Sequence, residues 1–134
     1  MDDISVPVAP GELIDKLTIL RLKAERIIDP AKLENVRREQ SALQDVADRT
    51  LPDHRDLPSL WEELYGIHAR LWVIEDDIRA CDARGDFGEE FIALARAVYQ
   101  TNDLRAKVKR RINEVLGSAL VEEKSYHGHG EGAT

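Results

Sequence analysis

Apolar residues recur at alternating steps of four and three along most of the chain, which is the period of a helix buried on one side. The first such segment is expected to start near Pro10, because proline suits the opening turn of a helix. Asp29 and Pro30 then end it and begin a second helix, since aspartate caps helices and proline favours their first position. The apolar stripes are Leu13, Leu17, Leu20, Ala24 and Ile27 in the first helix, and Leu33, Val36, Leu43, Val46 and Ala47 in the second.

Two longer helices follow a loop at residues 49–58 that contains two prolines. Ser59 and Glu62 have the spacing of a capping box, which predicts the start of the third helix. Gly85 is expected to stop it, and a second capping box from Asp86 to Glu89 starts the fourth helix, which runs to about Gly117. At the usual rise per residue these two helices are each about 35–45 Å long, against about 25 Å for the first two.

These elements predict an all-α protein, an antiparallel bundle of about four helices behind a short extended N-terminal segment. The short connection makes the last two helices a long hairpin. We expect one helical domain at residues 1–126 and a disordered Gly/His tail at residues 127–134. Because the long hairpin overhangs the first pair of helices, we expect a second copy of the chain to cover it, as a homodimer.

The apolar stripe of the fourth helix turns polar for about two turns between Val98 and Val108, where Thr101, Asn102 and Arg105 occupy it. Burying an amide and a guanidinium group is costly unless each finds partners. The third helix offers such partners in a second stripe beside its apolar one, at steps of four, three and four: His68, Trp72, Glu75 and Arg79.

Two interpretations of this polar layer stay open. In one it is a ligand pocket, in which Arg79 and Arg105 hold an anion, Glu75 or His68 moves a proton and Asn102 orients the ligand. In the other it is a satisfied polar layer that fixes the register of two long helices. The candidate ligand-binding residues are His68, Trp72, Glu75, Arg79, Asn102 and Arg105, and the pattern identifies no catalytic residue.

Composition excludes several classes of protein. The 134 residues fit one domain, and 19 basic against 26 acidic residues give a net charge of −7. The longest apolar run, residues 91–95, is too short to insert into a membrane, and the N-terminus lacks the features of a secretory signal. Cys81 is the only cysteine and forms no internal disulfide, which favours a cytoplasmic location.

Charge is unevenly distributed along the two long helices. Residues 104–111 carry five basic side chains that wrap around the helix without aromatic neighbours, so no nucleic-acid binding is expected. Residues 75–90 carry seven acids against two arginines, and this complementarity favours association of adjacent helices or of two copies. His127, His129 and Glu131 match no structural zinc spacing, so we expect neither metal nor cofactor.

Four stretches together resemble an uncharacterised bacterial family of all-helical proteins, known only as a domain of unknown function. They are residues 10–16, 71–79, 101–105 and 120–126. The resemblance implies that the family motif includes Trp72, Glu75, Asp76, Arg79, Asn102, Asp103 and Arg105. Members tend to be encoded beside glycosyltransferases of surface-polysaccharide pathways. The family has no established activity, so the resemblance implies no catalytic residue.

Two functions follow as hypotheses. The first is a small interaction or accessory module that binds a protein partner and performs no chemistry, since no complete catalytic constellation is present. The second is a protein that binds or acts on an anionic metabolite, phosphorylated or carboxylated and including sugar nucleotides, through the polar layer. Whether the chain is an enzyme stays open.

Overall fold

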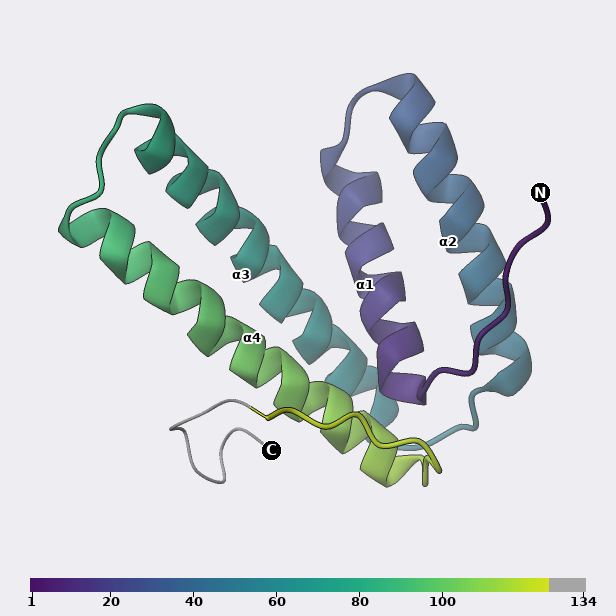
Figure 1. The fold of residues 1–134 in the computed structure, drawn as a ribbon. Helices are drawn as coiled ribbons and strands as arrows, with labels where there is room; N and C mark the ends of the chain where they lie inside the picture. The colour runs from purple at the N-terminus through teal and green to yellow at the C-terminus, as the bar shows by residue number, and fades with distance from the viewer. Residues whose placement is uncertain (126–134) are drawn as a thin grey trace.

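The computed structural model describes residues 1–125, which form four helices and no strand: α1 (Pro10–Arg26), α2 (Pro30–Thr50), α3 (Leu57–Ala83) and α4 (Glu89–Val115). They make two antiparallel hairpins, α1/α2 and α3/α4, which meet at one end and diverge toward their loops in a V (Figure 1). The predicted all-α fold of four helices is therefore confirmed. The expected tail at residues 127–134 lies outside the described part of the chain.

The helix starts agree with the sequence in the first hairpin and differ in the second. Asp29 caps α2 by accepting a hydrogen bond from the backbone N–H of Lys32 at 3.0 Å. Both predicted capping boxes are wrong. Because Pro58 favours the first turn of a helix, α3 begins ahead of Ser59, whose hydroxyl donates to the carbonyl of Asp56 instead. At α4, the side chain of Asp86 accepts from Gly88 N–H and caps no helical amide.

α1 is the central helix and packs on all three others. One face of it joins an apolar cluster with α3 and α4, and a neighbouring face joins a second cluster with α2. The partly buried Trp61 of α3 contacts both clusters. The first cluster is Ile14, Leu57, Leu64, Ile67, Val108 and Ile112, and the second is Leu13, Leu17 and Ala47. The hydrophobic core therefore lies where the two hairpins meet, which we call the base.

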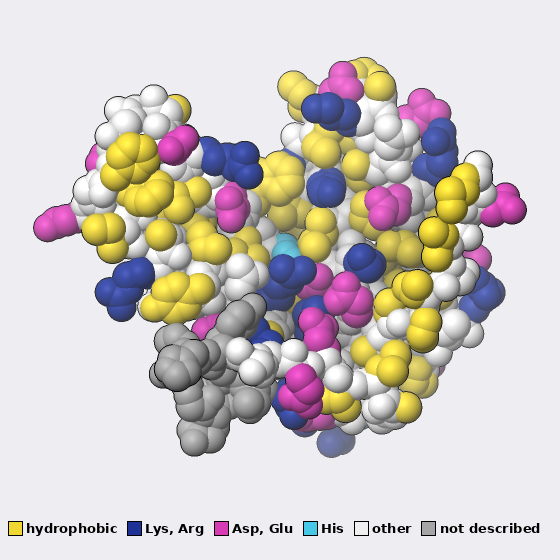
Figure 2. Space-filling model, in the orientation of Figure 1, with side chains coloured by type: hydrophobic (Ala, Val, Ile, Leu, Met, Phe, Trp, Pro, Cys, Tyr) yellow, Lys and Arg dark blue, Asp and Glu magenta, His cyan; other side chains and the backbone are white. Residues whose placement is uncertain are grey.

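Toward their loops the hairpins form two arms, the α1/α2 arm (residues 16–40), whose first turn still contributes Leu17 to the second cluster, and the α3/α4 arm (residues 72–100). Within the α3/α4 arm only Cys81 is buried, and exposed fractions are 57% for Phe87 and 54% for Ile92. Figure 2 shows hydrophobic side chains gathered on this arm and a notch between it and the other one. The predicted overhang of the long hairpin is therefore present, and its apolar side chains are only partly covered.

Two terminal segments border the helices. Residues 1–8 are exposed and lack regular secondary structure, as expected for an extended entry segment. After Gly117, whose φ of 67° ends α4, the chain turns back along α4 (Figure 1). The apolar side chains of this return segment are poorly covered, since Leu120 and Val121 are 45% and 56% exposed. Charge holds it instead, because Glu122 and Lys124 pair with Lys109 and Asp103 at 2.9 Å each.

No helix in the described residues is both long enough and apolar enough to cross a membrane.

Candidate functional site

A buried carboxylate, that of Asp15 on α1, lies at the centre of the polar residues in the base. It is 1% exposed and accepts hydrogen bonds from two other helices. His68 Nε2 of α3 lies 2.7 Å from Oδ1. Arg105 of α4 spans both carboxylate oxygens, with Nε 2.8 Å from Oδ1 and Nη2 2.6 Å from Oδ2. Asp15 therefore joins α1, α3 and α4 through one side chain.

These contacts determine the charge of the Asp15 carboxylate. Burial raises the pKa of Asp15, but the hydrogen bonds and positive charge of His68 and Arg105 lower it by more, so the pKa lies well below its usual range. The hydrogen bond to Asp15 in turn raises the pKa of Arg105 against the effect of its own burial. At neutral pH the centre of the base is an ionised, fully paired carboxylate.

A second ionic contact lies one turn further along α4. Lys109 Nζ is 2.7 Å from Glu12 of α1 and 2.9 Å from Glu122 of the return segment. Burial lowers the pKa of Lys109, but the hydrogen bonds that its ammonium group donates to both glutamates raise it above the usual value. In the described part of the chain, every buried side-chain nitrogen and oxygen has a hydrogen-bond partner. The polar layer is thus closed within the chain.

Gly11 permits the close approach of α1 to α4 on which this layer depends. Its backbone N–H donates to Asn113 Oδ1 at 2.7 Å. A Cβ atom at this position would lie 2.5 Å from the carbonyl oxygen of Lys109, which is backbone and cannot move aside alone. A larger residue would therefore separate the two helices.

The six predicted site residues fall into two groups. His68 and Arg105 meet at Asp15, and Asn102 Oδ1 accepts from Arg105 Nη1 at 3.3 Å. The other three lie further along α3, on the α3/α4 arm. The Trp72 ring faces Arg26 of α1, with Cζ 6.0 Å from the ring centroid.

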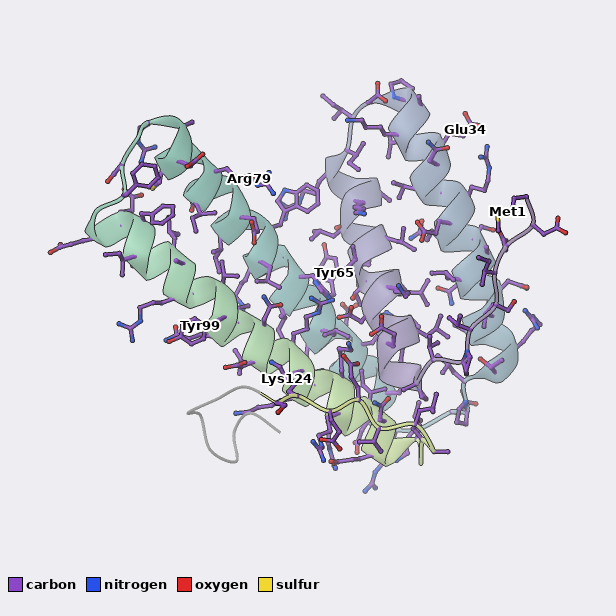
Figure 3. All side chains as sticks on the ribbon, viewed as in Figure 1. Met1, Glu34, Tyr65, Arg79, Tyr99 and Lys124 are labelled. Atoms are coloured by element: carbon purple, nitrogen blue, oxygen red, sulfur yellow. The ribbon has the colours of Figure 1, made fainter. Side chains whose placement is uncertain are left out.

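Glu75 and Arg79 pair loosely with each other at 4.0 Å, and their side chains are 48% and 80% exposed. Figure 3 shows Arg79 extending from α3 toward the space between the two hairpins. The expected approach of Glu75 to Arg105 does not occur, because Asp15 of α1 occupies the guanidinium. The structure therefore does not bring the six residues into one pocket.

The sequence reasoning missed Asp15, the residue on which the site depends, together with Glu12, Lys109 and Asn113. The sequence did contain a signal for Asp15. Asp15 and Thr18 interrupt an apolar segment that is buried on two sides, and Thr18 donates to the Asp15 carbonyl at 2.8 Å. A search for one stripe on the first helix overlooks its second buried face, where these residues lie.

The arrangement favours a structural role over a chemical one. His68 Nδ1 has no protein partner, and since no buried nitrogen is orphaned in the described residues, this atom reaches solvent. An imidazole held by a carboxylate can act as a base. Here, however, Arg105 spans both oxygens of that carboxylate, and Asp15 equally engages the guanidinium that would hold an anion.

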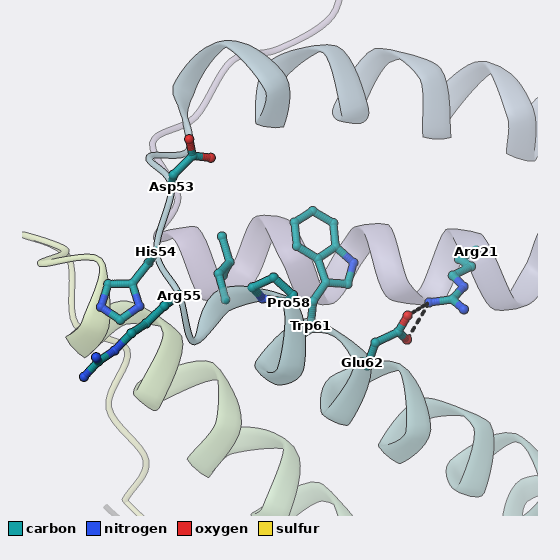
Figure 4. Close-up of a pocket in the computed structure, with 8 residues that line it drawn as sticks. Arg21, Asp53, His54, Arg55, Pro58, Trp61 and Glu62 are labelled. Carbon is teal, nitrogen blue, oxygen red and sulfur yellow. Dashed lines mark hydrogen bonds and ion pairs between the residues drawn. The ribbon is translucent and has the colours of Figure 1, made fainter.

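A pocket of about 750 Å³ lies on another side of the base, around Trp61. Figure 4 shows the Trp61 ring pointing toward α2, with the Arg21–Glu62 ion pair beyond it. None of the six predicted site residues lines this pocket. Of its charged lining residues, Arg21 and Glu62 bind each other at 2.8 Å. Asp53 and Arg55 are exposed and form no ion pair among the described residues.

A group of potential metal ligands lies at the tip of the α3/α4 arm, where one ligand atom each of Cys81, Asp86 and Glu90 falls within 4.8 Å of the others. Arg84 already supplies a cation there, with Nη2 3.4 Å from the sulfur and 3.8 Å and 3.6 Å from the two carboxylates. Burial raises the pKa of the Cys81 thiol. The contacts of Arg84 with these three side chains hold the loop between α3 and α4 and explain why the side chains lie close together.

The pKa of Asp15 predicts how stability depends on pH. A carboxylate with a lowered pKa in the folded state stabilises the fold above its unfolded-state pKa, and this contribution is lost as the pH falls below about 4. Urea unfolding of the wild type between pH 6 and pH 3 should therefore show a steep loss of unfolding free energy. In Asp15→Asn the loss should be shallower. Parallel pH profiles for the two proteins would contradict the assignment.

A small all-α protein in which a buried carboxylate joins three helices is the class that this geometry defines. By sequence, the chain belongs to a family of unknown function, DUF6165, whose family model matches residues 4–131. This confirms the expected membership of an uncharacterised family, and the match extends beyond Tyr126 into the tail. No curated protein matches the chain, and no solved structure matches it either.

Proposed function

We propose that this chain is a non-catalytic helical interaction module, whose base holds two arms in place for a protein partner. The observation that carries the proposal is the thin α3/α4 arm, which leaves Val73, Phe87, Ile92 and Tyr99 between 43% and 57% exposed. Large apolar side chains gathered on one exposed element are typical of a protein-binding surface. The module works in the cytoplasm under this proposal, since a free cysteine such as Cys81 is typical of a reducing compartment.

The polar layer supports the same proposal, because it favours a structural role over ligand binding. Asp15, His68 and Arg105 satisfy one another inside the base, so their role is to set the angle and register of α1 against the α3/α4 hairpin. The competing function, binding of an anionic metabolite, needs free cationic groups at the polar layer. Arg105 is engaged by Asp15, and Arg79 is exposed on the arm beside Glu75.

Site-specific photo-crosslinking in living cells tests the proposal. A photoreactive amino acid at position 92 lies on the exposed apolar surface of α4, and the same group at Ser59 lies on the exposed first turn of α3, outside both arms, as a matched control. We expect a discrete crosslinked protein product from position 92 and none from position 59. Equal labelling from both positions, or none from position 92, would contradict a binding role for the arm.

A further inference from the structure

The two arms carry opposite net charge. The α1/α2 arm has seven Lys and Arg against four Asp and Glu, a net charge of +3. The α3/α4 arm has three Arg against seven Asp and Glu, a net charge of −4. Two α3/α4 arms placed together would therefore repel, whereas an α3/α4 arm placed on an α1/α2 arm would attract.

The fold leaves much of this charge without a partner. The arms diverge beyond the contact of Arg26 with Trp72, so they do not neutralise each other within the chain (Figure 1). Several charged side chains of the arms take part in no hydrogen bond or ion pair among the described residues, and they include Lys23, Lys32, Asp76 and Asp82. By contrast, four of the five basic residues at 104–111 form ion pairs within the chain, two of them in the polar layer of the base.

Both arms also expose apolar side chains. Ile28 at the tip of the α1/α2 arm is 90% exposed, and Phe87 at the tip of the α3/α4 arm is 57% exposed. A partner that fits both arms needs one acidic and one basic helical element, each with apolar residues. The chain itself has this combination.

We propose that the occupant of the notch is a second copy of this chain, with the acidic α3/α4 arm of each copy lying on the basic α1/α2 arm of the other. A two-fold dimer makes this contact twice, because each surface meets its complement in the partner. The inference rests on the proposed function and names the partner of the same arms.

Sedimentation velocity on charge-reversed variants tests this dimer. Asp76→Lys/Asp82→Lys brings the acidic arm to a net charge of zero, and Lys23→Glu/Lys32→Glu makes the basic arm weakly acidic, with a net charge of −1. Neither variant removes a side-chain hydrogen bond or ion pair among the described residues. We expect the wild type to dimerise reversibly and more weakly at high salt, and each variant alone to dimerise at least about tenfold more weakly.

Mixing the two variants is the decisive part of the experiment. In the mixture the unchanged acidic arm of one variant can face the unchanged basic arm of the other, so we expect a one-to-one heterodimer that is tighter than the dimer of either variant alone. Asp2→Lys/Asp3→Lys makes the same charge change outside both arms and should dimerise like the wild type. A dimer that survives in both variants, or two variants that fail to combine, would overturn the pairing of arms.

A wild type that stays monomeric at low salt would overturn the second copy as the occupant. The proposed function fails separately, through the crosslinking at position 92. A monomer whose position 92 crosslinks to a different protein would keep the interaction module and replace the partner. A monomer without any crosslink would refute both the second copy as the partner and the interaction module itself.

Discussion

Replacing Asp15 with alanine should lower the free energy of unfolding by about 3–5 kcal/mol, because it removes one member of a buried ionic network and leaves the others unpaired. Arg105 is 31% exposed on its side chain and can recover some hydration, so the lower end of that range is expected. Urea unfolding at neutral pH measures the change. For a chain of this size, the loss corresponds to a fall in Tm of about 10 °C.

Asp45→Ala is the matched control for this substitution. Asp45 also pairs with an arginine on a helix, but its side chain is 71% exposed, so the expected change is within about 0.5 kcal/mol. Asp15→Ala and Arg105→Ala together should cost clearly less than the sum of the two single changes, since the residues form one network. A loss below about 1 kcal/mol for Asp15→Ala would mean that the carboxylate does not hold the base together.

Gly11→Ala should destabilise the protein by about 2–3 kcal/mol, although alanine is normally the better helix former. The added Cβ would lie 2.5 Å from the backbone carbonyl of Lys109 and 2.9 Å from Asn113 Oδ1. Relieving the overlap moves the start of α1 away from α4 and weakens the Gly11–Asn113 hydrogen bond. Thermal or urea unfolding measures the effect.

Gly66→Ala tests the same exchange where the structure leaves room. Gly66 lies within α3, and a Cβ there meets no atom within 4 Å. Alanine should therefore stabilise the protein by about 0.5–1 kcal/mol through helix propensity and the entropy of the unfolded chain. If both substitutions shift stability in the same direction, the close approach of α1 to α4 is wrong.

The sequence predicted the helices well because their signals are local. The steps of four and three in α3 mark a helix whatever packs against it, and Asp29–Pro30 marks a boundary through backbone chemistry alone. The capping boxes at Ser59 and Asp86 failed because several residues near each start compete for the same role. Only the position of Pro58 and the turn at Gly88 decide between them.

The site was harder to predict from the sequence because it is built from residues far apart in the chain. The polar interruption at Asn102 and Arg105 was visible as a pattern, and His68 was placed on the facing stripe. The partner of Arg105, however, comes from α1, 90 residues away. Assigning it requires knowing that α1 is central and buried on two sides. The divergence of the hairpins, which separates Glu75 and Arg79 from the base, is likewise set by tertiary packing.

Native-state hydrogen exchange on the dilute wild type tests the central claim most directly, namely that a rigid base carries two weakly supported arms. Amides of α3 and α4 beside His68 and Ile112 should exchange only through global unfolding. Amides of the α3/α4 arm, such as those of Arg79 and Ile92, should exchange through local opening at a clearly lower free energy. Equal protection from the base to the tip of α3/α4 would show that the arm is complete without a partner and would contradict the account.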